Sequence, residues 1–121
     1  MDERNYHVDV IDSEGRSESC EMVRQNGDDC QIELFLRGQI YTGVAEDFFD
    51  ALCVVRIHIE PDGFLLNCYG ASKNVYPSRA SRQMSSGRQA YQMTMGYPAE
   101  RLGSIFDSGL DTQPASVDEQ R

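Results

Sequence analysis

The sequence predicts an α+β fold, in which a mainly antiparallel sheet packs against one principal helix. Two patterns support it: apolar and polar residues alternate in three short segments, and in one longer segment apolar residues recur every three or four positions. Turn-forming residues separate these segments. The 121 residues are a usual length for one domain. We expect a single domain over residues 1–108 and a disordered polar tail over residues 109–121.

Strands are expected in the first part of the chain. Residues 6–10 alternate apolar and polar side chains, and residues 30–36 do so more regularly. Residues 21–24 predict a shorter strand, which an Asn-Gly turn separates from the next one. Gly38 then lets the chain turn or bulge before residues 39–41.

The principal helix is expected over about residues 43–60, with Thr42 as its N-terminal cap. Apolar residues recur there at helical spacing: Ala45, Phe48, Phe49, Leu52, Cys53, Val55 and Ile59. Charged residues occupy the other side: Glu46, Asp47, Asp50 and Arg56. A Pro-Asp-Gly sequence directly after this segment ends the helix and turns the chain.

Further strands and a short second helix are expected after the principal helix. Residues 64–69 are mostly apolar and predict a central strand of the sheet. Residues 74–78 are extended up to a proline, and residues 78–85 predict the short second helix. Residues 90–95 alternate and predict a strand, and residues 104–106 predict a short last strand.

The formal net charge of −9 is unevenly distributed. Residues 1–62 contain 15 acidic and 5 basic residues, whereas residues 63–121 contain 5 acidic and 6 basic residues. An acidic half disfavours nucleic acids and anionic membranes as partners, because both attract lysine and arginine. It favours a basic partner, since opposite charges speed encounter. Acidity that serves only solubility is the alternative interpretation.

The sequence also bears on localisation. No stretch approaches the roughly 20 apolar residues that a membrane helix needs. Residues 1–5 are polar and acidic, unlike the basic and then apolar start of a signal peptide. We therefore expect a cytoplasmic protein with no membrane partner.

The cysteines and histidines form no recognisable catalytic or metal-binding pattern. Cys20, Cys30, Cys53 and Cys68 include no Cys-x-x-Cys pair, and the two histidines share no ligand spacing. Motifs of serine hydrolases, zinc proteases and dinucleotide-binding proteins are missing. A Cys–His nucleophile pair without a local motif stays open. We expect no enzyme activity, no metal and no cofactor.

Five acidic residues near the predicted helix are candidates for a binding surface: Asp28, Asp29, Glu46, Asp47 and Asp50. Glu46 and Asp50 are four positions apart, so a helix would place them on one face. Such a set suits a cationic partner, and it also suits a carboxylate pair for acid–base or metal chemistry. A solvated helix face is the third interpretation, because exposed charged faces are usual on amphipathic helices.

A basic segment over residues 73–101 supports an alternative function. Arg79, Arg82 and Arg88, together with serines nearby, could hold a phosphate or a nucleic acid. The segment lacks the glycine spacing of a phosphate-binding loop and the aromatic platforms of a nucleic-acid module. An internal counter-charge to the acidic half is the favoured interpretation.

One stretch of the chain carries a recognisable order of motifs. It runs through Leu65-Leu66-Asn67-Cys68-Tyr69-Gly70-Ala71-Ser72, Asn74-Val75-Tyr76-Pro77-Ser78, Gln83-Met84, Gly87, Ala90-Tyr91, Gly96 and Ile105-Phe106-Asp107. Through these motifs, residues 48–107 resemble small bacterial immunity proteins of polymorphic toxin and contact-dependent growth inhibition systems. Arg79-Ala80 stand where the relatives have Gly-Met.

The resemblance implies an interaction protein rather than an enzyme. An immunity protein binds its cognate toxin domain and blocks the active site or a neighbouring surface. If the toxin is a nuclease, its substrate groove is basic and an acidic inhibitor complements it. The five acidic candidates are then the expected contacts, with Phe35 and Tyr41 as aromatic anchors. A small enzyme with a pocket near Cys68, Tyr76 or Arg79 is the remaining alternative.

Overall fold

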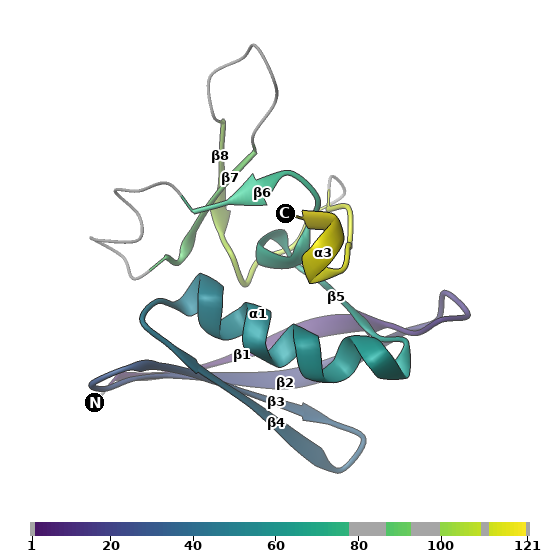
Figure 1. Cartoon of the computed structure of the whole chain (residues 1–121), viewed down its shortest axis with the longest axis horizontal. Helices are drawn as coiled ribbons and strands as arrows, with labels where there is room; N and C mark the ends of the chain where they lie inside the picture. Colours follow the sequence, from purple (N-terminus) through teal and green to yellow (C-terminus); the bar gives the residue numbers. More distant parts are fainter. Residues whose placement is uncertain (1, 78–86, 93–99, 110–111, 121) are drawn as a thin grey trace.

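Two antiparallel sheets and one principal helix form the structure, a computed structural model that describes residues 2–77, 87–92, 100–109 and 112–120 (Figure 1). The predicted α+β class is confirmed. The principal helix α1 lies on one face of the larger sheet, and the smaller sheet lies on the far side of α1 (Figure 1).

The larger sheet contains five antiparallel strands: β1 (Asp2–Ile11), β2 (Ser17–Asn26), β3 (Cys30–Leu36), β4 (Gln39–Ala45) and β5 (Leu65–Asn67). Their order is β4-β3-β2-β1-β5, so β4 and β5 are the edges. The strands predicted before the helix are confirmed, and the first two are longer than predicted. The central strand predicted over residues 64–69 is wrong. These residues supply only the short edge strand β5, because the chain then turns into the short helix η2 (Tyr69–Ala71).

Helix α1 (Phe48–Ile59) begins later than predicted, and Thr42 is not its cap. The residues around Thr42 instead belong to β4, which pairs with β3 over seven residues. Asp47 caps the helix, because its carboxylate accepts a hydrogen bond from the backbone N–H of Asp50 at 2.7 Å. The short helix η1 (Glu60–Asp62) follows directly.

Alternate residues of the larger sheet face α1, and we call this side of the sheet the covered face. Eight apolar residues of β1, β2 and β3 are at most 5% exposed there: Val8, Val10, Cys20, Met22, Cys30, Ile32, Leu34 and Leu36. The helix contributes Phe48, Leu52, Val55 and Ile59, which are all fully buried. Gly43 of β4 lets α1 approach closely, because a Cβ there would lie 2.1 Å from the carbonyl oxygen of Ala51.

The smaller sheet contains three antiparallel strands in the order β6 (Val75–Tyr76), β7 (Gln89–Gln92) and β8 (Glu100–Ser104). The predicted strand over residues 104–106 is wrong, because β8 ends at Ser104 and the buried residues Ile105 and Phe106 form a turn. The short helix predicted at residues 78–85 and the end of the strand predicted at 90–95 lie outside the described residues.

The C-terminal segment over residues 112–120 packs against the domain, so the predicted disordered tail is wrong for these residues. The segment contains helix α3 (Val117–Gln120), and both Ala115 and Gln120 are 3% exposed. The Gln120 side-chain amide donates a hydrogen bond to the carbonyl oxygen of Val75 at 2.8 Å. Polar composition does not predict this packing, because buried backbone and amide hydrogen bonds hold the segment together with only two buried apolar residues, Ala115 and Val117.

A buried arginine of α1 also holds this segment. Arg56, which the helical pattern predicts on the exposed side, is 1% exposed. Its guanidinium donates hydrogen bonds to Gln120 Oε1 at 2.5 Å and to the carbonyl oxygen of Ala115 at 2.8 Å. Its Nε lies 3.7 Å from a carboxylate oxygen of Glu60. Burying a guanidinium is unfavourable unless its N–H groups are paired, so Arg56 and the segment stabilise each other.

Candidate functional site

The face of the larger sheet opposite α1, which we call the open face, carries a row of carboxylates. Strand register places Glu3 and Asp9 of β1, Glu21 of β2 and Glu33 of β3 on this face. These residues are far apart in the sequence, but their strands are neighbours. Among the described residues of the five strands that point to this face, none is a lysine or an arginine.

The open-face carboxylates are accessible to a partner. Glu3, Asp9 and Glu21 are exposed, and Glu33 is half-buried. The carboxylate of Glu3 accepts a hydrogen bond from the side-chain amide of Gln25 at 2.9 Å. This partner is uncharged, so it does not cancel the negative charge of Glu3. Four like charges on one face create a negative potential over it, which attracts a cationic surface.

Large apolar side chains lie on the β3–β4 side of the same face. Phe35 is directly opposite Ile40 in the strand register, and Val44 lies further along β4. The three residues are 37%, 58% and 49% exposed, respectively. Apolar side chains grouped beside charged ones are typical of a surface that binds another protein.

A shallow hollow of about 250 Å³ lies at one end of the open face, where the β2–β3 hairpin meets β4. It is lined by Gln25, Gly27, Asp28, Asp29, Gln31 and Val44. Both aspartates are exposed, so the hollow combines two carboxylates with the apolar side chain of Val44. This arrangement suits the long side chain of a lysine or arginine, which carries an apolar stem and a cationic head.

The five acidic residues predicted as contacts do not form one cluster in the structure. Asp28 and Asp29 lie in the hairpin beside the open face, and Glu46 is exposed just after β4. Asp50 is exposed on α1, on the other side of the sheet, and Glu46 does not share a helical face with it because α1 begins after Glu46. Asp47 is 7% exposed and its carboxylate caps the helix, so it serves the fold.

The two predicted aromatic anchors lie on opposite faces of the larger sheet. Phe35 belongs to the open face, next to the carboxylate row. Tyr41 belongs to the covered face, because it pairs with the buried residue Leu34. Tyr41 is half-buried, and its hydroxyl donates a hydrogen bond to the side-chain oxygen of Gln39 at 2.9 Å. Of the two, only Phe35 is placed to contact a partner on the open face.

The structure gives little support to the basic alternative. Arg79 and Arg82 lie outside the described residues. Arg88 is half-buried, and its carbonyl oxygen accepts a hydrogen bond from the backbone N–H of Ile105 at 2.8 Å. The described part of the segment therefore provides no group of arginines that would hold a phosphate.

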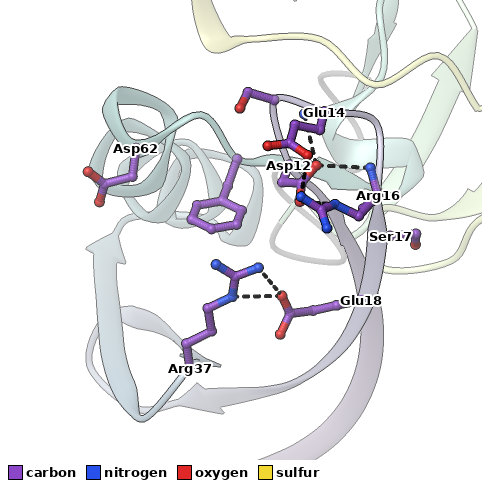
Figure 2. Close-up of a pocket in the computed structure, with 9 residues that line it drawn as sticks. Asp12, Glu14, Arg16, Ser17, Glu18, Arg37 and Asp62 are labelled. Carbon is purple, nitrogen blue, oxygen red and sulfur yellow. Dashed lines mark hydrogen bonds and ion pairs between the residues drawn. The ribbon is translucent and has the colours of Figure 1, made fainter.

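A second hollow, of about 450 Å³, is lined by two arginines that are both paired (Figure 2). Arg37 donates a hydrogen bond to Glu18 at 2.9 Å, and its guanidinium lies 4.9 Å from the centre of the Phe64 ring. Arg16 lies 3.6 Å from the carboxylate of Asp12. The Asp12 carboxylate also accepts a hydrogen bond from the Arg16 backbone N–H, which lowers the pKa of Asp12. The contacts of Arg16 with Asp12 close the β1–β2 hairpin, and the pair of Arg37 with Glu18 joins the β3–β4 turn to β2. We assign no ligand to the hollow.

The cysteine suggested by the enzyme alternative is poorly suited to catalysis. Cys68 is fully buried, and loss of solvent raises the pKa of its thiol to about 11. A thiol with this pKa is protonated at neutral pH, so it is a weak nucleophile. Within the described ranges, no group of three or more His, Cys, Asp or Glu side chains comes together as a metal site.

The carboxylates of the open face are not among the candidate contact residues predicted from the sequence. The signal for them exists, because the polar positions of an alternating strand share one face. The register of three strands is needed to place all four carboxylates on one face, and alternation within each strand does not supply that register.

Comparison with known proteins gives no further guide to this site. No protein-family model matches the sequence, and no curated protein matches it either. In the described part of the chain, no helix is long and apolar enough to cross a membrane. We therefore infer the function from the open face and from the motifs in the sequence.

Proposed function

We propose that this chain is an immunity protein, which binds and neutralises a cognate bacterial toxin domain through the open face of its larger sheet. The observation that carries the proposal is the row of carboxylates at Glu3, Asp9, Glu21 and Glu33. Among the residues that the structure describes on this face, none is a lysine or an arginine. The resemblance of residues 48–107 to small immunity proteins supports the same function.

Charge complementarity defines the kind of partner. A negative face steers a positively charged domain toward it and repels acidic competitors, so it favours fast and selective binding. A nuclease toxin has such a surface, because its substrate groove must attract phosphates. We therefore propose that the toxin surface which the open face covers is basic, and that binding blocks the active site or a neighbouring surface.

Two features of the open face add contacts to this electrostatic attraction. Phe35 provides an exposed aromatic ring beside the carboxylates, and aromatic side chains often dominate interface energetics. The hollow beside Asp28 and Asp29 would receive a lysine or arginine side chain of the toxin. In this arrangement the apolar contacts would supply much of the affinity, and the carboxylates would supply the rate of encounter and the selectivity.

The test is a binding measurement with the toxin domain encoded beside this gene. The double variant Glu21→Lys with Glu33→Lys reverses two charges of the open face. We expect the Kd at low salt to rise by at least about tenfold, and the difference to shrink as salt screens the charges.

A matched control makes the same change in net charge elsewhere. The double variant Asp50→Lys with Asp118→Lys reverses two exposed carboxylates, one on α1 and one on α3. We expect its Kd to stay within about threefold of the wild type, since neither residue lies on the open face. Equal losses in both double variants, or no loss in the first, would contradict the proposal.

A further inference from the structure

The strand β4 forms an edge of the larger sheet that is open to pairing. In the described part of the chain, β4 pairs with β3 on one side and with no strand on its other side. The opposite edge consists of the three-residue strand β5 and of residues 2–8 of β1, which β5 does not reach and which include charged side chains, whereas β4 has seven uncharged residues. An unpaired edge presents a row of backbone N–H and C=O groups that can continue the sheet into another chain.

Proteins usually protect such an edge, but β4 lacks the protections that a strand's own sequence and register can provide. Short length, lysine, proline and β-bulges are the usual devices. The strand reads Gln39-Ile40-Tyr41-Thr42-Gly43-Val44-Ala45, which contains no charged residue and no proline, although 26% of the chain is charged. Its register with β3 is continuous over all seven pairs, so no bulge twists the edge away.

The sequence of β4 is complementary to itself in the antiparallel direction. A two-fold axis at Thr42 pairs all seven residues with those of a second copy, and any other symmetric register pairs fewer. Ile40 then lies opposite Val44 of the second copy on the open face. On the covered face, Tyr41 lies opposite Gly43 of the second copy, the position at which α1 of that copy packs closely on the strand.

We propose that β4 pairs with β4 of a second copy of this chain, so that two five-stranded sheets join into one ten-stranded sheet. The exposed side chains of Ile40 and Val44, at 58% and 49%, would be partly buried by this pairing.

The pairing leaves the carboxylates of the open face accessible, although Ile40 and Val44 contribute to both surfaces, and it does not depend on the proposed toxin binding. Both copies point their open faces to the same side of the joined sheet, because the pleat continues across the edge. The two rows of carboxylates then lie on one doubled surface, on either side of an apolar strip formed by Phe35, Ile40 and Val44 of each copy. Dimerisation and toxin binding can therefore be tested separately.

Sedimentation equilibrium over a range of protein concentrations tests the dimer directly. We expect a mass between one and two chains that rises with concentration. The double variant Ile40→Lys with Val44→Lys places like charges across the edge, and we expect it to remain a monomer at every concentration. The control, Asn5→Lys with Ser19→Lys, adds the same charge at exposed positions of β1 and β2, away from the β4 edge, and should dimerise as the wild type does.

Cross-linking tests the register without disturbing the edge. Thr42→Cys places two thiols at the two-fold axis, where paired Cα atoms are about 4.5–5.5 Å apart, within the range of a disulfide. We expect mild oxidation to give a covalent dimer, whereas Ser19→Cys and the wild type, whose four cysteines are buried, should give none. A wild type that is monomeric at all concentrations, a dimer that the lysine pair leaves intact, or failure of Thr42→Cys to cross-link selectively would each overturn the proposal.

Discussion

The covered and open faces of the larger sheet are built from the same strands, but different physical constraints act on their side chains. Val8 and Asp9 are neighbours in β1, yet Val8 is 3% exposed against α1 and Asp9 is exposed on the open face. On the covered face, close packing restricts each position to a side chain of suitable size and polarity. On the open face most positions are exposed or half-buried, so packing restricts the side chains less, and the charges of one sign there are the basis of the proposed binding surface.

The largest difference between the two faces is expected at Gly43, because α1 leaves no space for a side chain at this position of the covered face. We expect Gly43→Ala to lower the free energy of unfolding by about 3 kcal/mol or more, because the new Cβ would clash with the backbone of α1. The neighbouring change Thr42→Val, on the open face, should shift it by less than about 0.5 kcal/mol. Urea unfolding followed by circular dichroism measures both, and similar midpoints for the two variants would contradict the distinction between the faces.

The next largest effect is expected at Arg56, on the side of α1 that faces the C-terminal segment. Arg56→Met keeps the apolar stem but leaves the carbonyl oxygen of Ala115 without its donor, so we expect a loss of about 3 kcal/mol. Cleavage within residues 112–120 by a nonspecific protease should become faster as well. Arg16→Met, at an exposed position, is the control and should change neither measurement.

A smaller effect is expected at the N-terminal cap of α1. Asp47→Ala removes the carboxylate that accepts from the Asp50 N–H, and such caps contribute about 1 kcal/mol. Glu46→Ala alters the adjacent exposed carboxylate and should change thermal stability by much less. If the melting temperatures of the two variants fall equally, Asp47 does not have the structural role assigned to it here.

The smallest effect is a dependence on pH at Glu60. Burial raises the pKa of the Glu60 carboxyl, although the Val117 N–H and the Arg56 guanidinium act in the opposite direction. A raised pKa in the folded state means that its stabilising contribution is complete below the unfolded pKa and is lost as pH rises through the folded pKa. The stability of the wild type relative to Glu60→Gln should therefore fall, by less than about 1 kcal/mol, between about pH 4 and pH 7. Urea unfolding at a series of pH values measures this difference, and a rise with pH would contradict it.

Local patterns predict the covered face well and the surrounding structure less well. Alternation in residues 6–10 and 30–36 identifies β1 and β3, because each strand is buried on one side only. The helix start is misplaced because Thr42-Gly43 resembles a cap followed by a flexible residue. In the structure Gly43 is a strand residue whose small size serves contact with α1, and contacts of this kind are not visible in a local pattern.

Long-range contacts explain the features that the sequence does not predict. The partners of Arg56 in the C-terminal segment lie 59 and 64 positions away, so a helical pattern reads the arginine as solvent-exposed. Similarly, Glu3 and Glu33 share a face only after β2 has paired with both of their strands. The acidic half was predictable as a composition, but its concentration on one face depends on strand register.

The position of Arg56 in the chain also has a consequence for synthesis. Translation produces α1 well before Ala115 and Gln120, so the guanidinium must wait for the groups that pair with it. During that interval the side of α1 that will face the C-terminal segment is open to water, which hydrates the guanidinium. The hydrogen bonds that bury this side of the helix can form only after residue 120 has been added.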